Sequence, residues 1–244
     1  MKKVVILTSG GMDSCALNAY LARELGFLVL SLPPEMVNIV EGGKRWEIHP
    51  IFFDYGQLSA KEEQKAASEF LKRIGNYKLC TIKIENPTLK IPMTGHGRMP
   101  EVSDKDFNET KHLDWVPHRN FIFLTLAAQY ASIIGTNTLA ISSHKEELFP
   151  FPDSTRETFN SIEEALTLSD GRKHRWKILT PFLERGWYKW DIVKWCFKHQ
   201  LPLNYTYTCY KGQEKHCGVC RGCYDRKQAF KHAGVVDETE YEGA

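Results

Sequence analysis

The sequence lacks a long hydrophobic run, an excess of charge of one sign, and any repeated or low-complexity segment. Its apolar stretches all fall short of the roughly 18 residues that a membrane-spanning helix needs, so we expect no membrane association. The net charge is only +2, and no segment is densely rich in Lys and Arg, which argues against nucleic acid as a direct partner. With 25% charged and 42% hydrophobic residues, the chain has an ordinary globular composition.

The sequence also lacks the pattern of a disulfide framework. It contains seven cysteines, an odd number; Cys15, Cys80 and Cys196 are scattered, and the other four lie within 15 residues near the end of the chain. Such a count argues against paired disulfides. A short apolar stretch and a glycine-rich segment follow residues 1–3 directly, so cleavage of a signal peptide would cut through the candidate site described below. We therefore expect a cytoplasmic protein.

Strand-like apolar segments alternate with helical patterns along the 244 residues, a length that suits one large α/β domain with or without a small appendage. We expect strands at residues 4–7, 27–32, 51–53, 79–84, 138–142 and 178–181, and helices at residues 15–25, 61–74, 120–134, 155–168, 189–199 and 224–230. This order predicts an α/β fold with a doubly wound, mostly parallel sheet, whose ligands bind beyond the carboxyl ends of the strands. Residues 86–114 contain three prolines and two glycines and predict a long loop near such a site.

The most informative segment consists of Ser9, Gly10, Gly11, Met12, Asp13 and Ser14. It lies between an expected strand and an expected helix, where glycines let the backbone approach phosphate oxygens and the first helical N–H groups are unpaired. Ser9 and Ser14 add hydroxyl donors, and the Asp13 carboxylate is expected to hold Mg²⁺ or to cap the helix. The segment is neither a Walker A loop nor a Rossmann fingerprint. Its alternative interpretation is an ordinary glycine turn.

A second motif is formed by Cys209, Cys217, Cys220 and Cys223. Four thiolates satisfy one tetrahedral Zn²⁺, and such a closed site stabilises a fold rather than catalysing a reaction. The alternatives are a redox Cys-x-x-Cys pair, free thiols, or a zinc knuckle that binds RNA. We expect the neighbouring His216 to be solvated, with a role as a spare metal ligand as the alternative.

The order of the motifs is more specific than any one of them. The chain carries, in sequence, Ser9 to Ser14, Phe53-Asp54-Tyr55-Gly56-Gln57, Val116-Pro117-His118-Arg119-Asn120, Pro152-Asp153, Thr208-Cys209-Tyr210 and the Cys217-to-Cys223 pattern. This series resembles the 7-cyano-7-deazaguanine synthase family, which belongs to the PP-loop ATP pyrophosphatases. The resemblance spans nearly the whole chain, and the cysteine pattern is its most specific part.

The resemblance implies a PP-loop fold, of the adenine-nucleotide α-hydrolase-like type, and an ATP-dependent ligase. Family members adenylate the carboxylate of 7-carboxy-7-deazaguanine, ammonia displaces AMP to give an amide, and a second ATP activates the amide so that loss of AMP leaves the nitrile. The implied cofactors are ATP, Mg²⁺ and Zn²⁺, and the implied assembly is a homodimer. The implied domains are residues 1–204, which bind ATP and catalyse, and residues 205–244, a zinc-binding appendage.

The resemblance also implies roles for individual residues. Catalytic roles fall to Ser9, Asp13, Ser14, Arg119 and Asp153, and nucleotide contacts to Ser9, Gly10, Gly11, Met12, Asp13, Ser14, Asp54, Tyr55, Gln57, Arg119 and Asn120. Arg119 would stabilise the adenylate phosphate, and Asp153 would face the deazaguanine. The open alternatives are a turn-forming role for Asp54, a salt bridge for Arg119, and an N-cap of the helix at residues 155–168 for Asp153.

Three stretches depart from the family pattern. Leu58 and Ser59 stand where the family carries Arg-His, and His118 stands where it carries Gly. Ser154 replaces a cysteine on the substrate side, a residue is added before Arg156, and the segment at residues 31–49 is longer than usual. The phosphate loop and the cysteines are intact, a pattern that is expected if the activation chemistry is retained and the substrate or the acceptor has changed.

Two alternative functions follow from these departures. The first is a relative that adenylates a deazaguanine carboxylate and stops at an amide, or conjugates it to an amine of a partner protein, as in an antiviral-defence system. The second is a tRNA-modifying PP-loop enzyme, or a nucleotide-binding module without turnover. The locally basic segment around the cysteines supports the tRNA alternative, whereas the low net charge opposes it.

Overall fold

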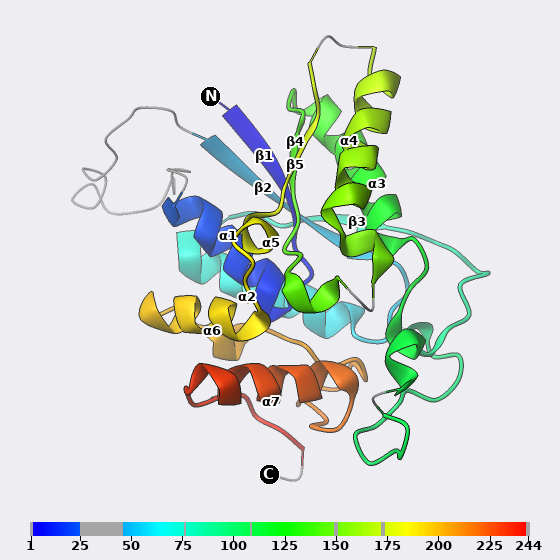
Figure 1. The fold of residues 1–244 in the computed structure, drawn as a ribbon, viewed down its shortest axis with the longest axis vertical. Helices are drawn as coiled ribbons and strands as arrows, with labels where there is room; N and C mark the ends of the chain where they lie inside the picture. Colours follow the sequence, from blue (N-terminus) through cyan, green and yellow to red (C-terminus); the bar gives the residue numbers. More distant parts are fainter. Residues whose placement is uncertain are drawn as a thin grey trace.

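The computed structural model describes residues 2–24, 46–75, 77–107, 109–148, 151–171 and 174–242. A five-stranded sheet lies at its centre (Figure 1), with the order β3-β2-β1-β4-β5 and parallel pairing throughout. The strands are β1 (Lys2–Leu7), β2 (Trp46–Asp54), β3 (Cys80–Lys83), β4 (Thr138–Ala140) and β5 (Lys177–Leu179). The strand expected at residues 27–32 and most of the long segment at residues 31–49 lie outside the described residues.

Helices pack on both faces of the sheet, so the predicted doubly wound α/β class is confirmed. They are α1 (Met12–Glu24), α2 (Ala60–Gly75), α3 (Arg119–Ile133), α4 (Arg156–Ser169), α5 (Pro181–Glu184), α6 (Lys189–Lys198) and α7 (Arg221–Ala233). Several expected boundaries are wrong: α1 begins three residues before its expected start at residue 15, and β2 begins five residues before its expected start at residue 51. The last strand ends at Leu179, because Pro181 suits the first turn of a helix and opens α5. The last helix begins at Arg221, three residues before its expected start.

The alternation of side chains along β1 produces two cores. Val4 and Ile6 pack on one face with residues of α1, α6 and α7, whereas Val5 and Leu7 pack on the other face with residues of α3 and α4. Successive side chains of a strand point to opposite faces, so a continuous apolar run is typical of a strand that is buried on both sides. The central position of β1 fixes the phosphate-loop segment at the middle of the sheet's carboxyl edge.

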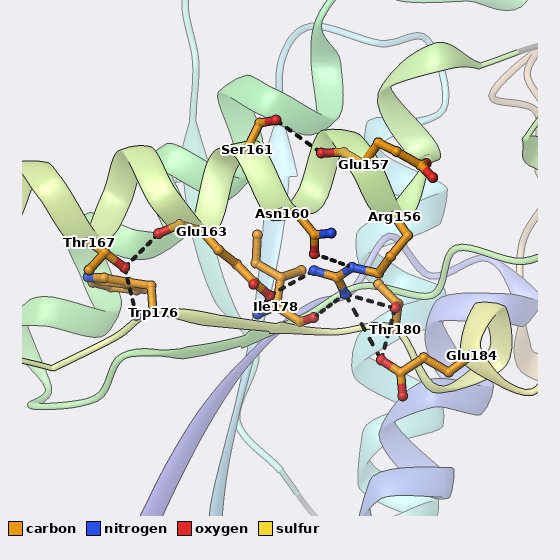
Figure 2. Close-up of polar contacts among 10 residues, drawn as sticks. All are labelled: Arg156, Glu157, Asn160, Ser161, Glu163, Thr167, Trp176, Ile178, Thr180 and Glu184. Atoms are coloured by element: carbon orange, nitrogen blue, oxygen red, sulfur yellow. Dashed lines mark hydrogen bonds and ion pairs between the residues drawn. The ribbon is translucent and has the colours of Figure 1, made fainter.

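Polar side chains of α4 cover the edge of the sheet at β5 (Figure 2). The Ile178 N–H donates to Glu163 Oε1 at 2.7 Å, and the Ile178 carbonyl accepts from Arg156 Nη1 at 2.9 Å. Arg156 Nη2 donates to the same Glu163 oxygen at 2.8 Å. An edge strand otherwise presents unpaired backbone groups, so this arrangement closes the edge with side chains.

The C-terminal segment packs into the body of the protein. Ala229 and Phe230 of α7 belong to the same apolar cluster as Ile192 of α6 and Val4 of β1. The fully buried Arg226 guanidinium donates to the carbonyl of Leu203 at 3.0 Å. Residues on both sides of position 204 thus share one core, and the division at that position stays a prediction. In the described ranges, no helix is both long and apolar enough to cross a membrane.

Candidate functional site

A cavity of about 220 Å³ opens where the strand order of the sheet reverses, between the carboxyl ends of β1 and β4. Its walls come from the loop after β1, the ends of β2 and β4, the first turns of α3 and α6, and residues 207–210. In open parallel sheets this reversal point is where ligands bind, because the loops on its two sides diverge.

The glycine loop after β1 is tightly fixed. Gly10 has a φ of +82°, and a Cβ atom there would collide with the backbone carbonyl of Glu63 in α2, so only glycine fits. The Ser14 hydroxyl donates to the Gly11 carbonyl at 3.1 Å and accepts from the Ser9 N–H at 3.1 Å. The loop is held in place by these bonds before any ligand arrives.

The start of α1 supplies donors to the cavity. Its first helical hydrogen bond runs from the Cys15 N–H to the Gly11 carbonyl at 3.0 Å. The N–H groups of Met12, Asp13 and Ser14 therefore precede the helical ladder, and all three residues line the cavity. Together with the helix dipole, these groups fit the phosphates of a nucleotide.

Asp13 lies beside two basic side chains, Lys189 and His144. Its Oδ2 is 3.3 Å from Lys189 Nζ and 3.6 Å from His144 Nε2, and His144 Nε2 is 3.7 Å from Glu147 Oε1. Burial raises the pKa of Asp13, but Lys189 and His144 outweigh it and hold that pKa well below its usual value. The Asp13 Oδ1 atom is buried and has no hydrogen-bond partner in the described part of the chain. One free carboxylate oxygen beside a phosphate cradle fits Mg²⁺, which takes one or two carboxylates and completes its shell with phosphates and water.

His144 and Lys189 were missed by the sequence analysis. His144 is almost fully buried; burial lowers its pKa, but Glu147 and Asp13 outweigh burial and raise it. Lys189 likewise keeps its charge, because Asp13 overcomes the effect of burial on its pKa. Their positions in the sequence could have indicated a site role, because His144 follows the end of β4 and Lys189 is the first residue of α6. A bond of 2.9 Å from the Lys145 N–H to the Trp187 carbonyl joins these two segments.

The predicted residues after β2 have different positions. Tyr55 and Gln57 line the cavity, and the buried Gln57 side chain accepts from the Tyr55 N–H at 2.9 Å. Asp54 Oδ1 accepts from the Gly56 N–H at 3.0 Å, which is the turn-forming role named as its alternative. Asp54 is not among the described residues that line the cavity.

Arg119 and Asn120 open α3, as predicted, and both line the cavity. Their contact with a nucleotide stays a prediction. Burial lowers the pKa of Arg119, but Tyr55, Tyr210 and Glu147 outweigh it, so the guanidinium stays charged. Arg119 and Lys189 thus give the cavity two permanent cations.

Asp153 lies in a different environment from the one expected for a residue that contacts the base. Its buried Oδ2 accepts from the Asn120 N–H at 3.0 Å and so caps the first turn of α3. The alternative that it caps the following helix is wrong, since Thr155 is the N-cap of α4 and accepts from the Thr158 N–H. Asp153 is absent from the described lining of the cavity, and its contact with a deazaguanine stays a prediction.

The four cysteines near α7 come together as the spacing predicted. The Sγ atoms of Cys209, Cys217, Cys220 and Cys223 lie within 4.8 Å of one another, and all four residues are buried. The Cys217 N–H donates to Cys209 Sγ and the Cys220 N–H to Cys217 Sγ, each at 3.4 Å, which favours thiolates. No other group of three or more His, Cys, Asp or Glu with this geometry occurs in the described ranges.

The expectation that His216 is solvated is wrong. Its side chain is buried, and its Nε2 accepts from the Thr208 N–H at 3.1 Å. Burial lowers its pKa to about 4, so the ring is neutral and acts as an acceptor. His216 therefore fixes the backbone segment that precedes Cys209.

A parallel sheet of this order, with a glycine loop at its reversal point and a four-cysteine group beside its last helix, defines an α/β protein of the PP-loop type. A family model described as queuosine biosynthesis protein QueC matches residues 36–234. The chain belongs to this family, as the order of its motifs predicted.

Curated relatives match the chain over nearly its whole length. A 7-cyano-7-deazaguanine synthase of Methanobrevibacter smithii is 34% identical over 247 residues, which cover 98% of each chain. One from Thermoplasma volcanium is also 34% identical and covers 98% of this chain and 91% of the relative. Among solved structures, the U34-tRNA thiolase NcsA from Methanococcus maripaludis with its 4Fe-4S cluster is 13% identical, with a TM-score of 0.46, and covers 97% of this chain and 74% of that one. This last likeness is too distant to inform the chemistry.

Proposed function

We propose that this protein converts 7-carboxy-7-deazaguanine and ammonia to 7-cyano-7-deazaguanine with ATP. The observation that carries the proposal is one cavity that combines the glycine loop, two permanent cations and an unpartnered Asp13 oxygen, in a chain 34% identical to synthases of that name. A carboxylate oxygen is a poor leaving group, and transfer of AMP from ATP converts it into a good one.

The chain's own residues have electrostatic and positioning tasks in this reaction. The N–H groups of Met12, Asp13 and Ser14 bind pyrophosphate, and the Ser9 hydroxyl adds a further donor. Arg119 and Lys189 stabilise negative charge that develops on phosphate oxygens, and they need no rearrangement because neighbouring groups already hold them. Asp13 holds Mg²⁺ through its free Oδ1 atom.

We propose zinc as the ion of the cysteine group. Sulfur atoms within 4.8 Å of one another fit four bonds to a single ion, whereas in an iron–sulfur cluster the thiolates bind different irons and stand further apart. A closed Cys₄ site leaves no open position for substrate, so its role here is to fix residues 207–210 against the cavity.

We also propose that the enzyme is a cytoplasmic homodimer. The support within the fold is α3, which exposes Phe121, Ile122 and Ile133, the last to 80%. Such residues on one helix fit a protein contact better than water. Light scattering on the purified protein measures the mass directly, and a monomeric mass contradicts the homodimer.

The deciding experiment identifies the products made by purified protein with ATP, Mg²⁺, 7-carboxy-7-deazaguanine and ammonium. Mass spectrometry is expected to find the nitrile together with AMP and pyrophosphate. A reaction that stops at the amide, or AMP without nitrile, would favour the relative that conjugates the base to an amine of a partner protein. That second candidate is favoured by the replacement of the substrate-side cysteine by Ser154, whose hydroxyl accepts from Asn120 at 3.0 Å. Salt-sensitive tRNA binding without any AMP release would instead point to a tRNA-modifying enzyme.

A further inference from the structure

Glu63 is an acidic residue on the wall of a cavity suited to anions. It lies in the first turns of α2 and lines the cavity with Tyr55, Gln57 and Arg119. A carboxylate repels phosphate, so its presence beside a phosphate loop calls for a ligand group of another kind. The sequence analysis assigned Glu63 to no site.

The Glu63 carboxylate is held in one orientation. Its Oε2 accepts from Gln57 Nε2 at 2.9 Å, and its Oε1 accepts from the Ser59 hydroxyl at 2.8 Å. Ser59 is fully buried and Gln57 nearly so. Each carboxylate oxygen has a second lone pair, so the group can still accept hydrogen bonds from the cavity.

Ser59 also explains one departure from the family pattern. It stands where the family carries His, and its hydroxyl reaches the carboxylate of Glu63 one helical turn later. The serine at this position therefore supplies a hydrogen bond that holds the Glu63 carboxylate in place.

The position of Glu63 relative to the phosphate loop indicates the group that it meets. Its backbone carbonyl packs directly on Gly10, so its side chain starts beside the phosphate loop. In a nucleotide the ribose is bonded to the α-phosphate, so a group that binds ribose must lie next to one that binds phosphate. Phe53 and Phe123 line the same cavity, and their rings, stacked with centroids 4.3 Å apart, offer an apolar wall for a base. A fixed carboxylate is the usual acceptor for ribose hydroxyls.

We propose that Glu63, supported by Ser59 and Gln57, binds the ribose hydroxyl groups of ATP. The inference rests on the proposed function, because it takes ATP as the nucleotide. It assigns the preference for ribonucleotides over deoxyribonucleotides to a residue of α2 rather than to the phosphate loop.

The test compares nucleotides that differ by one hydroxyl. Isothermal titration calorimetry measures the affinity of the wild-type protein and of Glu63→Ala for ADP, 2′-deoxy-ADP and 3′-deoxy-ADP. A hydrogen bond to a charged acceptor corresponds to roughly 10-fold or more in affinity. We expect the wild type to prefer ADP over at least one deoxynucleotide by about that factor, and Glu63→Ala to lose the preference by weakening ADP alone.

Three further variants separate recognition from folding. Glu63→Gln keeps the size of the side chain and one acceptor oxygen, and we expect it to lose part of the preference for ADP. Ser59→Ala frees the Glu63 carboxylate to move, and we expect it to lose part of that preference as well. The matched control is Glu62→Ala, the adjacent residue, which pairs with Lys65 at 3.9 Å and lines a different pocket. The control is expected to keep the wild-type preference, and thermal melting confirms that each variant is folded.

The proposal is overturned if the wild type binds all three nucleotides equally, or if folded Glu63→Ala keeps the full preference. It is also overturned if the main effect of Glu63→Ala on turnover is a higher half-saturating concentration of ammonium, because Glu63 would then serve the acceptor. Binding of ADP is measured without the deazaguanine. If the protein makes no nitrile but still prefers ADP over a deoxynucleotide, the proposed reaction is refuted and the ribose contact of Glu63 is retained.

Discussion

At the scale of single residues, charge at the candidate site is balanced by neighbours from distant parts of the chain. Asp13 comes from the phosphate loop, His144 from the segment after β4, and Lys189 from the start of α6. Asp13 and Lys189 keep their charges against the cost of burial because they lie 3.3 Å from each other, and the carboxylates of Glu147 and Asp13 raise the pKa of His144. The sequence motif contained only the first of the three.

Replacement of Lys189 by Met should impair the reaction. The side chain keeps its length but loses the cation on the cavity wall, and loss of one such stabilising group typically lowers turnover by roughly 100-fold. Pyrophosphate release under saturating ATP measures the effect. Lys194→Met, on the exposed side of the same helix, is the control and should stay within two-fold of wild type, roughly. A folded Lys189→Met protein with normal turnover would contradict the role.

Replacement of His118 by Gly should stabilise the protein. His118 is exposed and has a φ of +56°, a left-handed conformation that a Cβ atom disfavours by about 1 kcal/mol. The family pattern has Gly at this position. The free energy of unfolding from urea titration should therefore rise by about 0.5–1 kcal/mol in His118→Gly. His118→Ala keeps the Cβ atom and should show no gain; an equal gain there would refute the explanation.

Replacement of Asp114 by Asn should stabilise the protein at neutral pH. Burial, and then the charge of Asp225, raise the pKa of the buried Asp114 to about 6. The folded state thus binds a proton more tightly than the unfolded state, so stability is full below about pH 4 and declines as pH rises through 6. Asp114→Asn should remove this decline and gain on the order of 2 kcal/mol at pH 8. Urea unfolding at pH 4.5 and pH 8 checks it, and parallel pH profiles for both proteins would contradict it.

At the scale of elements, the helices and strands of the described chain follow from local patterns, but their contacts do not. The apolar periodicity predicted α2, α3 and α6 within a residue or two of their ends. It gave no sign that Asp153, from the segment before α4, caps α3. Nor did it show that α4 supplies the hydrogen bonds for the outer edge of β5.

Replacement of Glu163 by Ala should loosen the edge of the sheet. The change leaves the Ile178 N–H unpaired and removes one partner of Arg156 (Figure 2). An unsatisfied, partly buried donor costs about 1–3 kcal/mol, so the free energy of unfolding should fall by that amount. Glu164→Ala, next in sequence and exposed, should change it by less than about 0.5 kcal/mol. Hydrogen exchange of the Ile178 amide should also become faster; unchanged exchange would argue against its bond to Glu163.

At the scale of the whole molecule, the cysteine group and the cavity form one structure. Tyr55 and Met93 belong to the same apolar cluster as all four cysteines. Tyr207, Thr208 and Tyr210, which flank Cys209 in the sequence, line the cavity. The segment at residues 86–114, predicted as a long loop, bonds to it through the Val102 N–H and the Val219 carbonyl at 2.8 Å. A metal bound at the cysteines would thus support this wall of the cavity.

Removal of the metal should therefore abolish activity together with part of the fold. Zinc is expected at one equivalent per chain by elemental analysis, and iron in its place would refute the zinc assignment. Cys223→Ser breaks the four-thiolate set and should lower the melting temperature by more than 5 °C, on the order expected for a loss above 1 kcal/mol. Cys80→Ser, which lies outside the group, is the control. Equal melting temperatures with and without metal would show that the ion has no structural role.

The sequence by itself determined the fold class, the glycine loop after β1, the four-cysteine group and the family, because these depend on the period of apolar residues and on motif spacing along the chain. Only the tertiary structure decided that Lys189 and His144 meet Asp13, that Glu63 stands beside Gly10, and that Asp153 caps α3. Coulomb and hydrogen-bond energies depend on distances in space, and packing of helices on both faces of the sheet sets those distances between residues far apart in sequence.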